Sequence, residues 1–137
     1  MIESLVVDAN PLLSALLGGR AREILFHGAW AFFSPQTTLF EVEKYLPFVA
    51  QKLGCPELDL FREFELLPVT AVQPHVYDLE MRRATQLIGW RDPKDVPVLA
   101  LALRLHLPVW TEDRDFENLP GVSVCKTADL LPLAGRP

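Results

Sequence analysis

The stretch of the chain that decides the fold is DPKDVPVLALALRLHLPVWTED, residues 92–113. After Asp95 the residues are so uniformly apolar that they predict a mostly buried helix over 96–105. Residues 108–111 then form a short apolar run that predicts a buried strand, and Asp113 follows it. A buried helix that leads into a buried strand is typical of a parallel sheet with crossover helices.

Four further apolar runs, working outward from this stretch, predict the other strands. They cover residues 4–8, 30–34, 67–72 and 122–124. Helical segments alternate with these runs along the chain. The expected fold class is therefore α/β, with a mostly parallel sheet of four to five strands.

The longest helical pattern precedes the third strand. After Pro35, apolar residues recur three or four positions apart and predict one long helix that ends at Gly54. Pro56 opens a second helix over 57–66, so the two helices form a hairpin. Another amphipathic helix is expected to start at Pro74. Apolar positions of the first and last of these helices are Leu39, Val42, Leu46, Val49 and Leu53, and Val76, Leu79, Ala84, Leu87 and Ile88.

Four acidic residues are expected to meet at one edge of the sheet. Asp8 and Asp113 follow strands, Asp95 precedes the buried helix, and Glu41 lies in the helix after the second strand. In a parallel α/β sheet the helices begin at the edge where the strands end. Clustered like charges are costly without a cation, and no Lys or His is expected to balance them. The pattern predicts a site for a hard divalent cation, Mg²⁺ or Mn²⁺.

Length and composition indicate one well-cored domain. The chain has 137 residues, of which 50% are hydrophobic and 23% are charged. We expect a single domain over residues 1–132 and a frayed tail over 133–137. No apolar stretch is long enough to span a membrane, the N-terminus lacks the features of a signal peptide, and the two cysteines are isolated. A cytoplasmic location is the simplest expectation.

The net charge of −5 argues against a general nucleic-acid binder, which normally has a basic surface. It is compatible with a nucleic-acid enzyme, because a metal site would neutralise part of the acidic cluster. Six basic residues lie near the acids in sequence, and a solvated surface is the default interpretation for each. They are Arg20, Arg22, Lys44, Arg91, Lys94 and Arg114.

Each candidate residue also has a purely structural interpretation. Asp95 could cap the buried helix, and Asp8 and Asp113 could be ordinary turn residues. Trp90 is expected at the edge of the core, although its position beside the acidic loop would also let it stack on a base. Taken together at the ends of two strands and one helix, the aspartates favour the metal site.

The chain resembles the PIN-domain family, metal-dependent nucleases that include the VapC-like toxins of toxin–antitoxin pairs. The matching segments occur in the family's order and cover nearly the whole chain. They are residues 7–10, 34–41, 92–102 and 111–116. The resemblance implies a three-layer α/β/α fold and hydrolysis of phosphodiester bonds in single-stranded RNA. It also implies an antitoxin partner and a homodimer paired through helices near the acidic edge.

The resemblance also implies roles for individual residues. Asp8, Asp95 and Asp113 match the family's aspartate ligands, with Asp8 and Asp113 as direct ligands and Asp95 direct or through water. Glu41 matches the helix glutamate that orients or deprotonates water, although Glu43 competes for this role. Three further residues are secondary candidates, namely Asp92 as a spare acid and Asn10 and Thr111 as small polar residues near the metal.

Two other functions stay open from the sequence. A catalytically silent PIN-like binding module would keep the core while losing an acid, and none of the four is missing here. A metal-dependent phosphatase would use the same ions. For the homodimer, the apolar stripe of the hairpin over 37–66 and its off-stripe aromatic residues predict the interface. These aromatic residues are Phe40, Tyr45 and Phe48.

Overall fold

A computed structural model of the chain describes residues 2–27 and 29–134, and within them it contains one parallel sheet of five strands. The strand order is β3-β2-β1-β4-β5, and every neighbouring pair is parallel. The strands are β1 (Ser4–Val7), β2 (Ala31–Pro35), β3 (Val69–Val72), β4 (Val109–Trp110) and β5 (Val124–Cys125). The predicted parallel α/β fold is confirmed, with β1 at the centre of the sheet.

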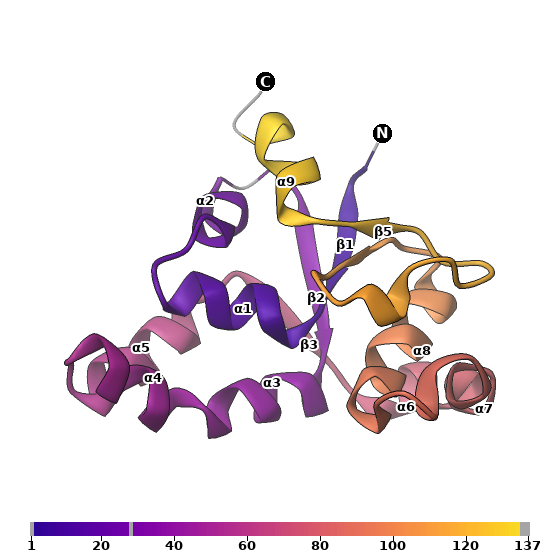
Figure 1. Cartoon of the computed structure of the whole chain (residues 1–137), viewed down its shortest axis with the longest axis horizontal. Helices are drawn as coiled ribbons and strands as arrows, with labels where there is room; N and C mark the ends of the chain where they lie inside the picture. The colour runs from indigo at the N-terminus through magenta and orange to yellow at the C-terminus, as the bar shows by residue number, and fades with distance from the viewer. Residues whose placement is uncertain (1, 28, 135–137) are drawn as a thin grey trace.

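Helices cover both faces of the sheet and give the molecule three layers (Figure 1). One face packs against α1 (Ala9–Leu16), α2 (Ala21–Phe26), α3 (Gln36–Lys44), α4 (Leu46–Leu53), α5 (Glu57–Leu66) and α9 (Thr127–Leu130). The other face packs against α6 (Pro74–Tyr77), α7 (Met81–Ala84) and α8 (Val96–Leu105). Short 3₁₀ or π turns lie between or after these elements: η1 (Asp78–Glu80), η2 (Thr85–Gly89), η3 (Pro93–Asp95), η4 (Arg114–Phe116) and η5 (Leu131–Leu133).

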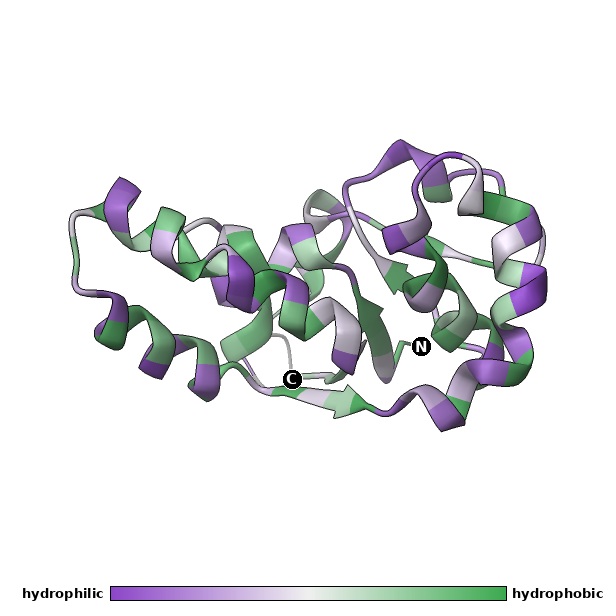
Figure 2. Cartoon of the chain, turned by 90° about the horizontal axis from the view of Figure 1, so that it is seen from below, coloured by the Kyte–Doolittle hydropathy of each residue, from purple (hydrophilic) through white to green (hydrophobic). Residues whose placement is uncertain are grey.

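The central strand separates two hydrophobic cores. Leu5 and Val7 point into the core on the α1 side, whereas Val6 points into the core on the α8 side. This alternation follows from the two-residue period of a strand. Figure 2 shows an apolar strand at the centre of the molecule, with polar residues on the outer turns of the helices. A strand buried on both faces explains why Leu5, Val6 and Val7 are all apolar.

The predicted long helix after Pro35 is wrong, because α3 and α4 are separate helices that meet at Tyr45. Pro47 lies in the first turn of α4, where a missing N–H costs no hydrogen bond. In the interior of one continuous helix the same proline would remove a hydrogen bond and break the helix. The apolar stripe largely faces inward, since Val42, Leu46 and Val49 belong to the core on the α1 side. This stripe is therefore not available for an interface. Only the exposed aromatic residues beside it are still candidates for one.

The helix predicted from Pro74 is also broken, into α6, η1, α7 and the π-helical turn η2. Leu79, predicted on its apolar face, is 79% exposed. At the C-terminal end, η5 extends to Leu133, and residues 135–137 of the predicted tail lie outside the described residues. No helix in the described part of the chain is long and apolar enough to span a membrane.

Candidate metal centre

Asp8 leaves the central strand at the carboxyl edge of the sheet and is 6% exposed. Its Oδ1 accepts a hydrogen bond of 2.8 Å from the Ala9 N–H and caps α1. Its Oδ2 accepts a hydrogen bond of 2.7 Å from the hydroxyl of Thr111. One carboxylate oxygen of Asp8 therefore acts as a helix cap, not as part of an ordinary turn, while the second oxygen faces the neighbouring strand end.

Thr111 connects the two acids that follow β1 and β4. The side chain is fully buried, and its Oγ1 accepts a hydrogen bond of 3.0 Å from the Asp113 N–H while donating to Asp8. Asp113 in turn caps η4, because its Oδ1 accepts from the Asp115 N–H at 2.9 Å. One hydroxyl group thus ties the carboxylate of Asp8 to the backbone of Asp113, two acids that follow different strands.

Asp95 completes the cluster from the other side of the sheet edge. It stands at the start of α8 and is 6% exposed, yet its side chain makes no capping hydrogen bond. Its Oδ2 is buried and has no hydrogen-bond partner among the described residues. One carboxylate oxygen from each of Asp8, Asp95 and Asp113 lies within 4.8 Å of the other two. A buried carboxylate oxygen without a donor fits a divalent cation, which supplies the missing partner.

The electrostatics of the cluster are those of acids crowded together without a cation. Burial raises the pKa of Asp95 to about 8, and the charges of Asp8 and Asp113 add to this effect. Burial also raises the pKa of Asp8, although the hydrogen bond from Thr111 opposes the shift. Like charges at this distance cannot all ionise freely without a counter-ion.

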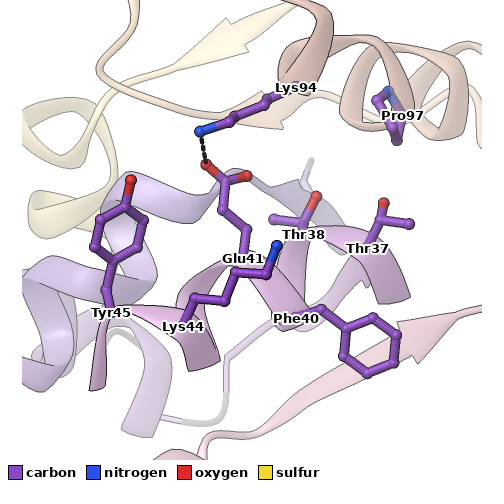
Figure 3. A pocket seen from close by; sticks show the side chains of 8 residues that line it. All are labelled: Thr37, Thr38, Phe40, Glu41, Lys44, Tyr45, Lys94 and Pro97. Atoms are coloured by element: carbon purple, nitrogen blue, oxygen red, sulfur yellow. Dashed lines mark ion pairs between the residues drawn. The ribbon is translucent and has the colours of Figure 1, made fainter. Parts of the chain in front are cut away.

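Glu41 reaches toward the acids from α3 but lies outside the group of three aspartates. The pKa of Glu41 is raised, because burial outweighs the opposing effect of the nearby Lys94 ammonium. Lys94 Nζ lies 3.8 Å from Glu41 Oε1, and Figure 3 shows the two side chains pointing toward each other. The expectation that no Lys balances the acids is therefore wrong for Glu41, whereas no ion pair of Lys94 with Asp8, Asp95 or Asp113 is seen among the described residues.

The secondary candidates lie around this centre in different ways. Asp92 caps η3 by accepting from the Lys94 N–H at 3.0 Å, and its charge raises the pKa of Asp8. Asn10 is exposed, and its side chain accepts from the Glu112 N–H at 3.4 Å. Glu43 lines a groove between α4 and α5 together with Leu58, on another side of the hairpin. The geometry therefore favours Glu41 over Glu43 for a role at the centre.

A cavity of about 460 Å³ opens beside Glu41. Thr38 and Tyr45 line it from the α3 side, and Lys94 and Pro97 close it from the start of α8 (Figure 3). Four of the six basic residues near the acids in sequence divide into two groups. Lys44 and Lys94 line this cavity, whereas Arg20 and Arg22 form ion pairs with Glu23 and Glu63 near α2.

Comparison with known proteins finds a family match over most of the chain. The family model described as PIN domain matches residues 6–131, and no curated protein matches the chain significantly. A toxin–antitoxin complex from Klebsiella pneumoniae is 22% identical, with 90% of this chain and 97% of that chain covered and a TM-score of 0.63.

Two further solved structures resemble the chain over a similar extent. DNA-bound VapBC from Salmonella typhimurium is 15% identical, covers 93% of this chain and 99% of its own, and has a TM-score of 0.68. VapBC2 from Rickettsia felis, bound to a promoter DNA fragment, is 14% identical, with 90% and 98% covered and a TM-score of 0.62. At these identities the likeness concerns the fold.

Proposed function

Because this chain belongs to the PIN domain family, we propose that it is a divalent-metal-dependent nuclease that hydrolyses phosphodiester bonds of single-stranded RNA. The observation that carries the proposal is the close group of buried Asp8, buried Asp95 and half-buried Asp113, in which Asp95 Oδ2 has no hydrogen-bond donor among the described residues. Three carboxylates held this closely are a suitable ligand set for Mg²⁺ or Mn²⁺.

The chain's own residues would divide the work as follows. Asp8 and Asp113 would hold the ion directly, and Asp95 would hold it directly or through a water molecule. When bound, the ion supplies stabilisation of negative charge on the phosphate oxygens and lowers the pKa of a bound water. Glu41 orients the attacking water and accepts its proton at a carboxylate oxygen. Since Lys94 pairs with Glu41 at 3.8 Å, this carboxylate is held in place on the rim of the cavity.

The structural neighbours support a more specific biological role. They are toxin–antitoxin complexes, and we propose that this chain is the toxin of such a pair, acting in the cytoplasm and bound by an antitoxin protein. A catalytically silent module is disfavoured, because all four acidic residues are present and three of them converge.

The proposal is tested by incubating the protein with labelled single-stranded RNA and with a phosphomonoester, each with Mn²⁺ or with a chelator. Cleavage of RNA only in the presence of Mn²⁺ is expected. Asp95→Ala and Asp113→Ala should lower the rate by more than about 100-fold, since loss of even an outer-shell partner costs about 10- to 100-fold. Circular dichroism of both variants should match the parent protein.

Two outcomes would contradict the proposal. Equal RNA cleavage by the parent protein and both variants would assign the aspartates to capping and turns alone. Hydrolysis of the phosphomonoester without hydrolysis of RNA would replace the nuclease by a phosphatase.

A further inference from the structure

Trp90 is the most exposed aromatic side chain in the described part of the chain, at 73%. It lies in the segment that joins α7 to α8 (Figure 1), directly after the π-helical turn η2 and two residues before Asp92. Runs of π-helix are rare and occur frequently at functional sites. A single exposed apolar side chain is common on protein surfaces, so what sets this ring apart is the set of contacts that place it near the turn carrying Asp113.

Arg91 fixes this ring relative to the acidic centre. Its guanidinium carbon lies 4.7 Å from the centroid of the Trp90 ring, over one face of the indole. Its Nη1 donates a hydrogen bond of 2.7 Å to the backbone carbonyl of Asp115. The Asp115 N–H in turn donates to Asp113 Oδ1 at 2.9 Å. The Arg91 guanidinium therefore links the ring to the turn that carries Asp113, while the ring itself stays open to solvent.

We propose that Trp90 and Arg91 form a nucleotide-binding platform, on which a base of single-stranded RNA stacks next to the bond that is cleaved. This inference rests on the proposed nuclease function. Stacking on an aromatic ring is tolerant of base identity, and an adjacent arginine adds cation–π and phosphate contacts. With a net charge of −5, the chain has little general attraction for RNA. Local stacking beside the acids would compensate for that deficit.

The surroundings of Trp90 favour a base over a protein partner. Its neighbours Arg91 and Lys94 are exposed and charged, and no other large apolar side chain between residues 85 and 95 is exposed. Protein interfaces instead gather several apolar or aromatic side chains at their centre. Several exposed side chains of that kind belong instead to residues 37–66, at Phe40, Tyr45, Phe48, Leu53 and Leu58.

The test measures binding of a single-stranded RNA of about eight nucleotides, a length within known site sizes for such binders. An Asp8→Asn background with Mg²⁺ prevents cleavage during the measurement. Adding Trp90→Ala should weaken binding about 5- to 150-fold, the loss typical of one stacked base. Trp90→Phe should retain most of the affinity. An RNA that lacks the stacked base should bind the background protein and its Trp90→Ala variant equally.

Phe26→Ala is the matched control. Phe26 is also exposed and is also covered by an arginine, since the Arg22 guanidinium lies 5.1 Å from its ring centroid. It belongs to α2, on the opposite face of the sheet from α7 and α8 (Figure 1). This variant should bind RNA as the background protein does.

The outcomes separate the platform from the proposed function. If the parent protein does not cleave RNA in Mn²⁺ and the Asp8→Asn variant does not bind RNA, the nuclease function and the platform are both wrong. If RNA is cleaved and bound but Trp90→Ala behaves like Phe26→Ala, the nuclease stands and the platform is wrong. A Trp90→Ala variant that binds RNA normally but no longer binds a protein partner would refute the stacking. So would a variant whose loss of affinity is as large for RNA lacking the base as for intact RNA.

Discussion

Thr111 uses both functions of its hydroxyl group, donating to Asp8 and accepting from the Asp113 N–H. Thr111→Val keeps the side-chain shape but leaves both of these buried groups without a partner. We expect the free energy of unfolding to fall by about 1–3 kcal/mol. We also expect the affinity for Mn²⁺ to fall by about 10- to 100-fold, because the two carboxylates lose their common support. Urea unfolding and calorimetric titration with Mn²⁺ measure the two effects.

Thr111→Ser is the control for this substitution, since it keeps the hydroxyl and removes only a methyl group. It should retain most of the Mn²⁺ affinity. Equal affinity in the valine variant and the parent protein would show that the hydroxyl does not position the carboxylates.

The pKa of Asp95 makes the stability of the metal-free protein depend on pH. Its folded-state pKa of about 8 lies above the value near 3.9 of an unfolded aspartate. Protonated Asp95 therefore favours the fold, and this contribution is lost as the pH rises from about 4 to about 8. Relative to Asp95→Asn, the melting temperature of the metal-free protein should fall across this range.

Added Mn²⁺ should act in the opposite direction on the parent protein, because the ion binds the deprotonated carboxylates and stabilises the fold by mass action. Thermal unfolding at several pH values, with Mn²⁺ or with a chelator, tests both effects. A pH profile of the chelated parent protein parallel to that of Asp95→Asn would show that Asp95 titrates normally.

The positions of two strand ends and one helix start were sufficient to predict that Asp8, Asp113 and Asp95 lie together. Parallel strands end, and their crossover helices begin, at the same edge of the sheet. The ion pair between Lys94 and Glu41 could not be predicted from the positions of strand ends and helix starts. It joins the turn before α8 to α3, so it depends on how two elements distant in sequence face each other. Charge pairs of this kind carry no local sequence signal.

The predicted helix boundaries were wrong at two places where the apolar period in the sequence is regular. The apolar period runs without interruption across Tyr45, but Pro47 starts a new helix there. After Pro74 the period is equally regular, yet the backbone forms four short pieces and exposes Leu79. By contrast, the predicted helix over residues 96–105 has the same bounds in the structure, because its sequence is apolar throughout and must be enclosed.

Gly54 ends α4 in the left-handed region, with φ of 70°. A methyl group added there would meet no atom within 4 Å, so the cost of Gly54→Ala comes from the backbone alone. We expect this variant to lose about 1 kcal/mol of unfolding free energy. Gly54→Asn should lose less, because asparagine tolerates this conformation. Urea unfolding that ranks alanine above asparagine would contradict the explanation.

The exposed aromatic residues of the hairpin bear on the assembly of the whole molecule. Phe40 and Phe48 are 50% and 62% exposed, and α4 and α5 project from one end of the molecule (Figures 1 and 2). We predict a homodimer through this surface, since aromatic residues are enriched at interface cores. Light scattering should give a dimer mass for the parent protein and a monomer mass for the Phe40→Glu, Phe48→Glu double variant.

Leu79→Glu is the control, because Leu79 is more exposed than either phenylalanine but belongs to η1, on the other face of the sheet. It should remain dimeric. A monomeric parent protein across the micromolar range would end the proposal, and a dimer that survives the double variant would place the interface elsewhere.

The central position of β1 has a consequence for synthesis. Asp8 and Thr111 are 103 residues apart in the chain, and they meet only because β4 enters the sheet beside β1. Contacts this distant in sequence are slow to form and require nearly the whole chain. A nascent polypeptide on the ribosome carries Asp8 and Glu41 long before Asp95 and Asp113 are made. Partial translation products that end before Asp113 therefore lack the complete set of carboxylates, and the proposed activity can appear only after this residue has been made.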